Sequence, residues 1–227
     1  MSTKARAYIS AIIVAGAALV LWSVLNWQAP APLRFGLYLT LALIASAMKV
    51  RLPGLEATLS PGFVMVLVTA STSNWTETAI LSPLAGAMQS LVGAKRRPKW
   101  FQIAFNAANL TLAGVLANLF SGALAASAPT EGTGFARLCV ALVVLYFFNA
   151  TTVSVVVCLV QNRPLRTIWR LCNYYSIVGY FVGAVLAWMV LESTTLGWAG
   201  TLTVFALVYP LYLFHQSWIE ERQSRPA

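Results

Sequence analysis

Basic residues in this chain fall in every second gap between long apolar stretches. All of the 15 Lys and Arg residues follow that alternation except Arg34 and Arg137. In membrane proteins with several spans, the cytoplasmic loops carry an excess of Lys and Arg. The alternation therefore predicts a polytopic membrane protein and accounts for the formal net charge of +9. We do not expect nucleic-acid binding, because the densest basic cluster is short and lies directly against an apolar stretch.

The composition argues against a soluble fold. The chain is 59% hydrophobic and 9% charged, with a mean hydropathy of +0.75, whereas soluble domains carry about a quarter charged residues. Inside a bilayer, a helix satisfies its own backbone polar groups. We therefore expect an all-α bundle that forms one integral membrane domain over residues 1–227, as a multi-pass protein of the cell inner (cytoplasmic) membrane.

Eight apolar stretches are candidates for bilayer spans, which need about 20 residues each. They are Tyr8–Trp27, Phe35–Met48, Pro61–Ser73, Thr78–Gly93, Trp100–Ala126, Phe135–Val160, Leu171–Leu191 and Trp198–His215. The second and third are short, and they are separated by the helix breakers Pro53-Gly54 and Ser60-Pro61-Gly62. Either these two stretches extend into their flanks, or they form a re-entrant or broken-helix region buried in protein.

The start of the chain resembles a signal peptide, because the basic segment Met1–Arg6 precedes the first apolar stretch. Small residues near Ala29 and Ala31 would suit a cleavage site. The apolar stretch is nevertheless longer than the 7–15 residues usual in a signal peptide, and many further stretches follow. We therefore predict an uncleaved first span.

With eight spans, the loops sort by charge onto two sides. One side receives the following basic residues: Lys4, Arg6, Lys49, Arg51, Lys95, Arg96, Arg97, Lys99, Arg163, Arg166, Arg170, Arg222 and Arg225. The other side receives Gln28–Arg34, Ser73–Glu77, Ser127–Gly134 and Glu192–Gly197. The positive-inside rule then places both termini in the cytoplasm. This orientation holds even if the second and third stretches form a hairpin that does not cross the membrane. Removing two crossings leaves their total number even, so both termini stay on the same side.

Polar residues recur on the faces of three consecutive predicted spans. On the fifth, Gln102, Asn106 and Asn109 are spaced i, i+4 and i+7, which places them on one helical face. Polar groups in hydrocarbon need partners, so these faces should point into the bundle. Two interpretations stay open: interhelical hydrogen bonds alone, or a pocket for a small ligand between the fifth and seventh spans. The candidate ligand-binding residues are Gln102, Asn106, Asn109, Asn149, Thr152, Asn173 and Tyr180.

Small residues recur at four-residue spacing on the predicted fourth and seventh spans. They are Ser82, Gly86 and Ser90 on the fourth and Gly179, Gly183 and Ala187 on the seventh. Small side chains let helices approach closely. We interpret these stripes as packing within the chain rather than as a dimer interface.

The basic run between the fourth and fifth spans has two interpretations. Its members are Lys95, Arg96, Arg97 and Lys99. In the first, it is a topogenic loop that anchors the two spans. In the second, which is compatible with the first, it is a site for anionic lipid headgroups or an acidic partner.

The sequence lacks the usual signs of an enzyme. It has no His/Asp/Glu cluster of metal-ligand spacing and no phosphate-binding loop, and its sole histidine, His215, ends the last span. We therefore expect no enzymatic activity, no metal and no cofactor. The Glu residues are all expected near loops. We therefore expect no charge relay through the membrane of the kind that coupled pumps usually build from ionisable groups within spans.

One set of short motifs resembles a known family. It begins with Lys49-Val50-Arg51-Leu52-Pro53-Gly54, followed by Leu59-Ser60. It continues at Gln89-Ser90, Lys95 to Lys99, Gln102, Phe105-Asn106, Tyr209-Pro210-Leu211-Tyr212 and Glu220-Glu221. These segments resemble the membrane domain at the N-terminus of bacterial cyclic-di-nucleotide signalling proteins, which carry GGDEF or HD-GYP output domains.

The resemblance covers most of the chain and implies a multi-span sensor or membrane anchor. In that family a cytoplasmic output domain follows, whereas this chain stops at Ala227. The resemblance therefore implies a stand-alone version that passes its signal to a separate partner.

The leading hypothesis is a non-enzymatic sensor- or receptor-like membrane module with a small-ligand pocket. One alternative is a transporter subunit similar to the substrate-binding subunits of energy-coupling-factor transporters, and another is a structural subunit of a larger complex. The expected partners are membrane lipids, a small-molecule ligand and a separate cytoplasmic or membrane chain. A cavity lined by the amides favours a receptor or transporter, whereas amides that satisfy one another favour a structural subunit.

Overall fold

The computed structural model describes residues 1–28, 31–48, 50–51, 58–72, 74–92, 97–127, 133–193 and 197–206, together with the single residues 210, 213 and 217. Its helices are α1 (Thr3–Leu25), α2 (Pro32–Ala47), α3 (Phe63–Thr72), α4 (Trp75–Leu91), α5 (Trp100–Ser127), α6 (Thr133–Gln161), α7 (Leu165–Ser193) and α8 (Gly197–Ala206). The all-α class is confirmed, with one small addition. The two-residue strands β1 (Val50–Arg51) and β2 (Thr58–Leu59) pair antiparallel, with Val50 opposite Leu59.

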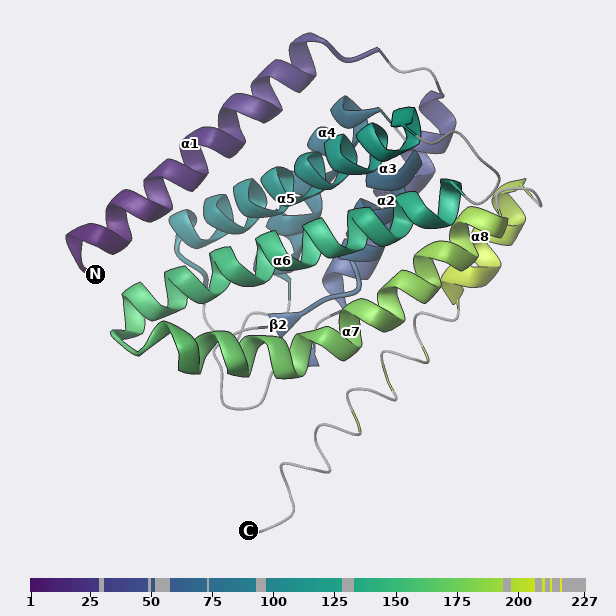
Figure 1. Cartoon of the computed structure of the whole chain (residues 1–227). Coiled ribbons are helices and arrows are strands. Elements are labelled where there is room, and N and C mark those ends of the chain that lie inside the picture. The colour runs from purple at the N-terminus through teal and green to yellow at the C-terminus, as the bar shows by residue number, and fades with distance from the viewer. Residues whose placement is uncertain are drawn as a thin grey trace.

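Consecutive helices from α1 to α7 alternate in direction (Figure 1). Helices α5, α6 and α7 lie side by side as antiparallel neighbours, and α1 packs against α5 and α6. Gly16 of α1 lies in close contact with Ala108 of α5, where an added Cβ would overlap. The antiparallel course of α6 and α7 places the ring of Phe135, at the start of α6, against Trp188, near the end of α7.

Four helical segments are long and apolar enough to cross a bilayer. They are Thr3–Leu25, Trp100–Ser127, Thr133–Gln161 and Ser176–Ser193. Their length and composition indicate a membrane protein. Helices α2 and α3 are apolar but shorter, with 16 and 10 residues. The predicted total of eight crossings therefore stays a prediction.

Helix α3 is the centre of the bundle, although it is too short to cross a membrane. Its 10 residues span about 15 Å, which is half of a typical hydrocarbon core of about 30 Å. Every residue from Phe63 to Ser71 is buried, and α2, α4, α5, α6 and α7 all pack against it. Its sequence, FVMVLVTAST, is apolar on all sides because it meets protein on all sides.

The link between α2 and α3 confirms the predicted breaker at Ser60-Pro61-Gly62, whereas Pro53-Gly54 lies outside the described residues. Helix α2 ends at Ala47, and α3 begins directly after the Pro61-Gly62 pair. The Ser60 hydroxyl donates a hydrogen bond to the Ala45 carbonyl (3.2 Å), so the end of α2 is tied to the start of α3. A Cβ at Gly62 would overlap the Ser46 side chain. This geometry supports the broken-helix alternative for the second and third apolar stretches.

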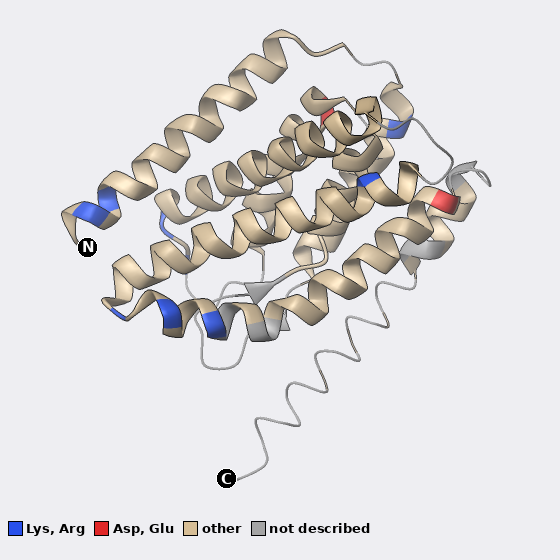
Figure 2. Ribbon diagram, viewed as in Figure 1, with Lys and Arg blue, Asp and Glu red and all other residues tan. Residues whose placement is uncertain are grey.

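The charged residues separate toward the two ends of the bundle (Figure 2). The described basic residues at one end, which we call the basic end, are Lys4, Arg6, Arg97, Lys99, Arg163, Arg166 and Arg170. Helices α1, α5 and α7 begin at that end. The opposite end carries Glu77, Glu192 and the two exceptions Arg34 and Arg137. Five residues of the predicted basic side lie outside the described residues: Lys49, Lys95, Arg96, Arg222 and Arg225.

Candidate functional site

Three amide and hydroxyl side chains form a hydrogen-bonded chain across α5, α6 and α7. The Nδ2 of Asn109 donates to the Oδ1 of Asn149 at 2.5 Å, and the Nδ2 of Asn149 donates to the Tyr180 hydroxyl at 2.7 Å. We call Asn109, Asn149 and Tyr180 the central amide network. The ring of Tyr180 also contacts Phe63, the first residue of α3, with a centroid separation of 4.4 Å. The network therefore lies beside the start of the buried half-length helix.

A second hydrogen-bonded pair adjoins this network. The Tyr146 hydroxyl donates to the Oδ1 of Asn173, and the Nδ2 of Asn173 donates to the Trp169 carbonyl at 2.7 Å. The Tyr146 and Tyr180 rings meet edge to face at 5.0 Å. The structure thus brings together four of the predicted ligand-binding residues from α5, α6 and α7: Asn109, Asn149, Asn173 and Tyr180.

The other predicted ligand-binding residues turn to different neighbours. The Nδ2 of Asn106 donates to the Ser90 hydroxyl on α4 at 2.9 Å, and Thr152 hydrogen-bonds with Tyr8 on α1. Gln102 is exposed, and its Oε1 accepts from the Lys99 backbone N–H at 2.8 Å. This contact satisfies one of the N–H groups that the start of a helix leaves without an intrahelical acceptor.

The central amide network retains unused hydrogen-bonding capacity. Asn109 is 2% exposed, and its Oδ1 is buried with no hydrogen-bond partner among the described residues. The hydroxyl of Ser154, further along α6, is also buried without a partner in the described part of the chain. A buried acceptor left without a donor costs about 1–3 kcal/mol. An N–H or O–H group of a bound molecule would remove that cost.

The predicted lipid-contact residues are only partly described. Arg97 and Lys99 are exposed just before α5 begins, and the Lys99 Nζ lies 6.0 Å from the centroid of the Phe101 ring. The neighbouring Trp100 is 75% exposed, as expected for an aromatic residue at a membrane interface. Lys95 and Arg96 lie outside the described residues.

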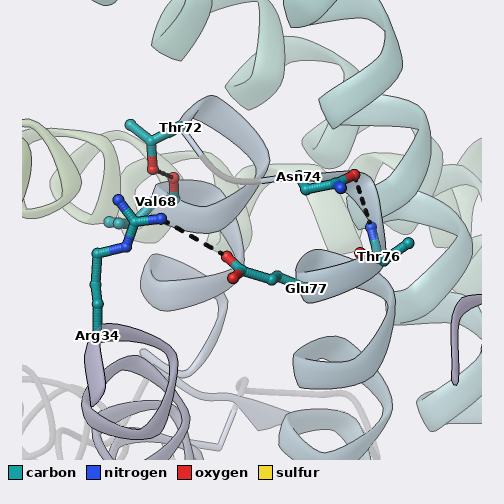
Figure 3. Close-up of polar contacts among 6 residues, drawn as sticks. All are labelled: Arg34, Val68, Thr72, Asn74, Thr76 and Glu77. Atoms are coloured by element: carbon teal, nitrogen blue, oxygen red, sulfur yellow. Dashed lines mark hydrogen bonds and ion pairs between the residues drawn. The ribbon is translucent and has the colours of Figure 1, made fainter. Parts of the chain in front are cut away.

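The structure adds an ion pair that the sequence interpretation missed. Glu77 was expected in a loop before a span starting at Thr78, but α4 begins earlier, at Trp75, and Glu77 is buried in its first turn. Figure 3 shows Glu77 facing Arg34 of α2, with 4.0 Å between Oε2 and Nη2. The pattern Asn74-x-x-Glu77 is a helix-start signal that would have moved the boundary. Indeed, the Asn74 side chain caps α4 by accepting from the Thr76 N–H at 3.4 Å.

Among the described residues, no group of three or more His, Cys, Asp or Glu side chains is placed to hold a metal ion. Cys139 and Cys158 both lie on α6 as free thiols. The expectation that the chain binds no metal or cofactor stays a prediction.

Comparisons with protein-family models, curated proteins and solved structures each returned no match. The resemblance to the membrane domain of cyclic-di-nucleotide signalling proteins therefore stays a prediction from the sequence. A functional proposal must rest on the contacts made by this chain.

Proposed function

We propose that this chain is a non-enzymatic, multi-pass protein of the bacterial inner membrane that binds a small polar ligand at the central amide network and acts as a sensor- or receptor-like module. The observation that carries the proposal is the buried Oδ1 of Asn109, which has no hydrogen-bond partner among the described residues. It belongs to a network that joins three helices, and amide groups that converge in an apolar surround are typical of ligand sites.

The position of the network supports a role in signalling. Tyr180 contacts Phe63 at the start of α3, and α3 packs against α2, α4, α5, α6 and α7. A ligand that binds more tightly to one arrangement of these helices would shift the population of that arrangement. Because the positive-inside rule assigns the basic end to the cytoplasm, a separate cytoplasmic or membrane partner would receive the change there.

The test is native mass spectrometry of the gently extracted protein, followed by comparison of variants. We expect a small molecule to co-purify with the wild type and to be lost from Asn109→Leu, which removes the acceptor while roughly conserving volume. Asn106→Leu is the matched control, because Asn106 is on the same helix but bonds to α4. Equal retention by both variants, or no co-purifying small molecule at all, would contradict the proposal.

A second candidate is a structural subunit in which the amides only lock helices together. It is favoured by the mutual pairing of Tyr146 with Asn173 and of Asn149 with Tyr180. On this alternative, replacing Asn109 lowers stability but changes no bound molecule. The retention experiment therefore separates the two functions.

A further inference from the structure

The Arg34–Glu77 pair lies at the end of the bundle opposite the basic end (Figures 2 and 3). The Glu77 side chain is 1% exposed, whereas that of Arg34 is 46% exposed. Their 4.0 Å separation allows attraction between charges but exceeds the length of an N–H···O hydrogen bond, 2.7–3.2 Å. The second carboxylate oxygen, Oε1, is buried and has no hydrogen-bond partner within the described part of the chain.

The described surroundings of Glu77 hold little positive charge. Thr76 and Thr78 flank it in sequence on α4, and each has a buried hydroxyl oxygen without a partner among the described residues, although adjacent residues of a helix do not face one another. Tyr38, one helical turn after Arg34, is 3% exposed and lies close enough to interact electrostatically with both Arg34 and Glu77. Among the other helices that pack against α4, α3 and α5 contain no ionisable side chain, and the Lys and Arg residues of α1 lie at the basic end, opposite Glu77. Arg34 is thus the only cationic group that the described residues place against this carboxylate.

The position of Glu77 at the start of α4 and its ion pair with Arg34 do not by themselves offset the cost of burying its carboxylate. Glu77 is the third residue of α4, where a negative charge interacts favourably with the helix dipole. That stabilisation is small compared with the desolvation cost of a buried carboxylate, which must be both paired and hydrogen-bonded to be offset. Arg34 supplies charge from a half-exposed position, and Oε1 has no donor among the described groups.

We propose that Glu77 forms part of a binding site for a small monovalent cation such as Na⁺, with Oε1 as a direct ligand. Carboxylate and hydroxyl oxygens are the ligands that hard cations prefer. A single carboxylate beside an arginine suits a charge of one better than a divalent ion. Arg34 would compete with the cation for the carboxylate, since its half-exposed side chain is free to move into solvent. This site is separate from the central amide network and does not depend on the function proposed for it.

The first test is the thermal unfolding of the full chain in detergent, with NaCl exchanged for choline chloride at constant ionic strength. We expect Na⁺ to raise the melting temperature of the wild type in a saturable manner, because a ligand that binds only the folded state stabilises it. Choline is too large to reach Oε1 and serves as the control for charge screening. Identical melting curves in the two salts would overturn the proposal.

Variants locate the site and test the competition. Glu77→Gln should lose the Na⁺ response, whereas Glu192→Gln, at an exposed position near the same end of the bundle, should keep it. In Arg34→Gln, the Na⁺ concentration at the midpoint of the response should be lower, on the order of fivefold, because Na⁺ no longer competes with a partly exposed ion pair. An unchanged midpoint in Arg34→Gln, or loss of the response in Glu192→Gln, would contradict the assignment. The Arg34→Gln and Glu192→Gln variants therefore test the proposed cation site even if Glu77→Gln does not fold.

Discussion

The side chain of Asn109 uses its donor and leaves its acceptor unpaired. Its Nδ2 bonds to Asn149 across the α5–α6 interface, while its Oδ1 is buried without a partner in the described part of the chain. Glu77 shows the same asymmetry, with one oxygen near Arg34 and the other without a hydrogen-bond partner in the described ranges. Both residues are almost fully buried, so unmet polar groups carry a real cost. This is why we place the two proposed binding sites at these residues.

Asn149 is the residue whose loss should most weaken the central amide network. Asn149→Leu removes hydrogen bonds to both Asn109 and Tyr180. We expect a loss of about 1–2 kcal/mol in unfolding free energy, since interhelical bonds in membranes average about 0.6 kcal/mol and two buried groups lose their partner. Unfolding in mixed micelles with increasing SDS measures the change.

Asn26→Ala is the matched control for that measurement. Asn26 is exposed, and its Nδ2 donates to the Trp22 carbonyl at the end of its own helix, α1. We expect a change within about 0.5 kcal/mol. If Asn26→Ala lowered the unfolding free energy as much as Asn149→Leu does, the hydrogen bonds of the central amide network would contribute no more than an exposed hydrogen bond.

Close helix packing depends on small residues at defined contacts. A Cβ at Gly86 of α4 would lie 2.8 Å from the Asn106 carbonyl oxygen on α5, and a Cβ at Gly183 of α7 would overlap the Phe63 ring of α3. Both glycines belong to the stripes that the sequence interpretation assigned to packing within the chain. Their neighbours in the structure are helices of the same chain, which supports that interpretation.

Gly86→Ala should therefore destabilise the bundle although alanine is the better helix former. The clash is with backbone, which cannot rotate away, so α4 and α5 must separate, and we expect a loss of about 1–3 kcal/mol. Gly122→Ala, on α5 with nothing within 4 Å of its added Cβ, is the control and should be neutral or stabilising. Thermal unfolding of the two variants compares them directly, and an equal effect would contradict the packing argument.

Over the whole molecule, charge is separated along the bundle while apolar side chains cover its flanks. The exposed apolar residues include Val14, Leu21 and Phe181 on α1 and α7, as expected where a helix faces lipid. Of the two basic residues that break the alternation, Arg34 has a partner in Glu77. The other, Arg137, also lies at the opposite end, whereas Lys4, Arg6, Arg97, Lys99, Arg163, Arg166 and Arg170 gather at the basic end (Figure 2). This separation is the basis of the proposed orientation.

The orientation is tested by cysteine labelling in a variant whose native cysteines, including Cys139 and Cys158, are replaced by alanine. Gly134→Cys lies at an exposed position of the end opposite the basic end, and Arg163→Cys lies at the basic end. We expect a membrane-impermeant maleimide to label the first in intact cells and the second only after permeabilisation. The reverse pattern would show that the basic end faces outward.

The sequence predicted the helices better than their contacts. The breaker Pro61-Gly62 correctly marked the start of α3, because a proline or glycine interrupts a helix through local backbone chemistry. The other predicted breaker, Pro53-Gly54, lies outside the described residues. The start of α4 was misplaced by three residues, and with it the burial of Glu77. Hydropathy detects a run of apolar residues. It does not detect a polar first turn such as Trp75-Thr76-Glu77, whose burial depends on the helices packed around it. The Asn74 cap was the local signal available.

By itself, the sequence determined that this protein is all-α, suited to a membrane, and basic at alternate loops. Those properties arise residue by residue, from hydropathy and charge along the chain. Only the tertiary structure decided that Asn109 meets Asn149 and Tyr180 while Asn106 turns to Ser90, and that the short helix α3 is the core. Such choices depend on how each helix is rotated against all its neighbours. Residues on one predicted face can therefore meet different helices, as the amides of α5 do.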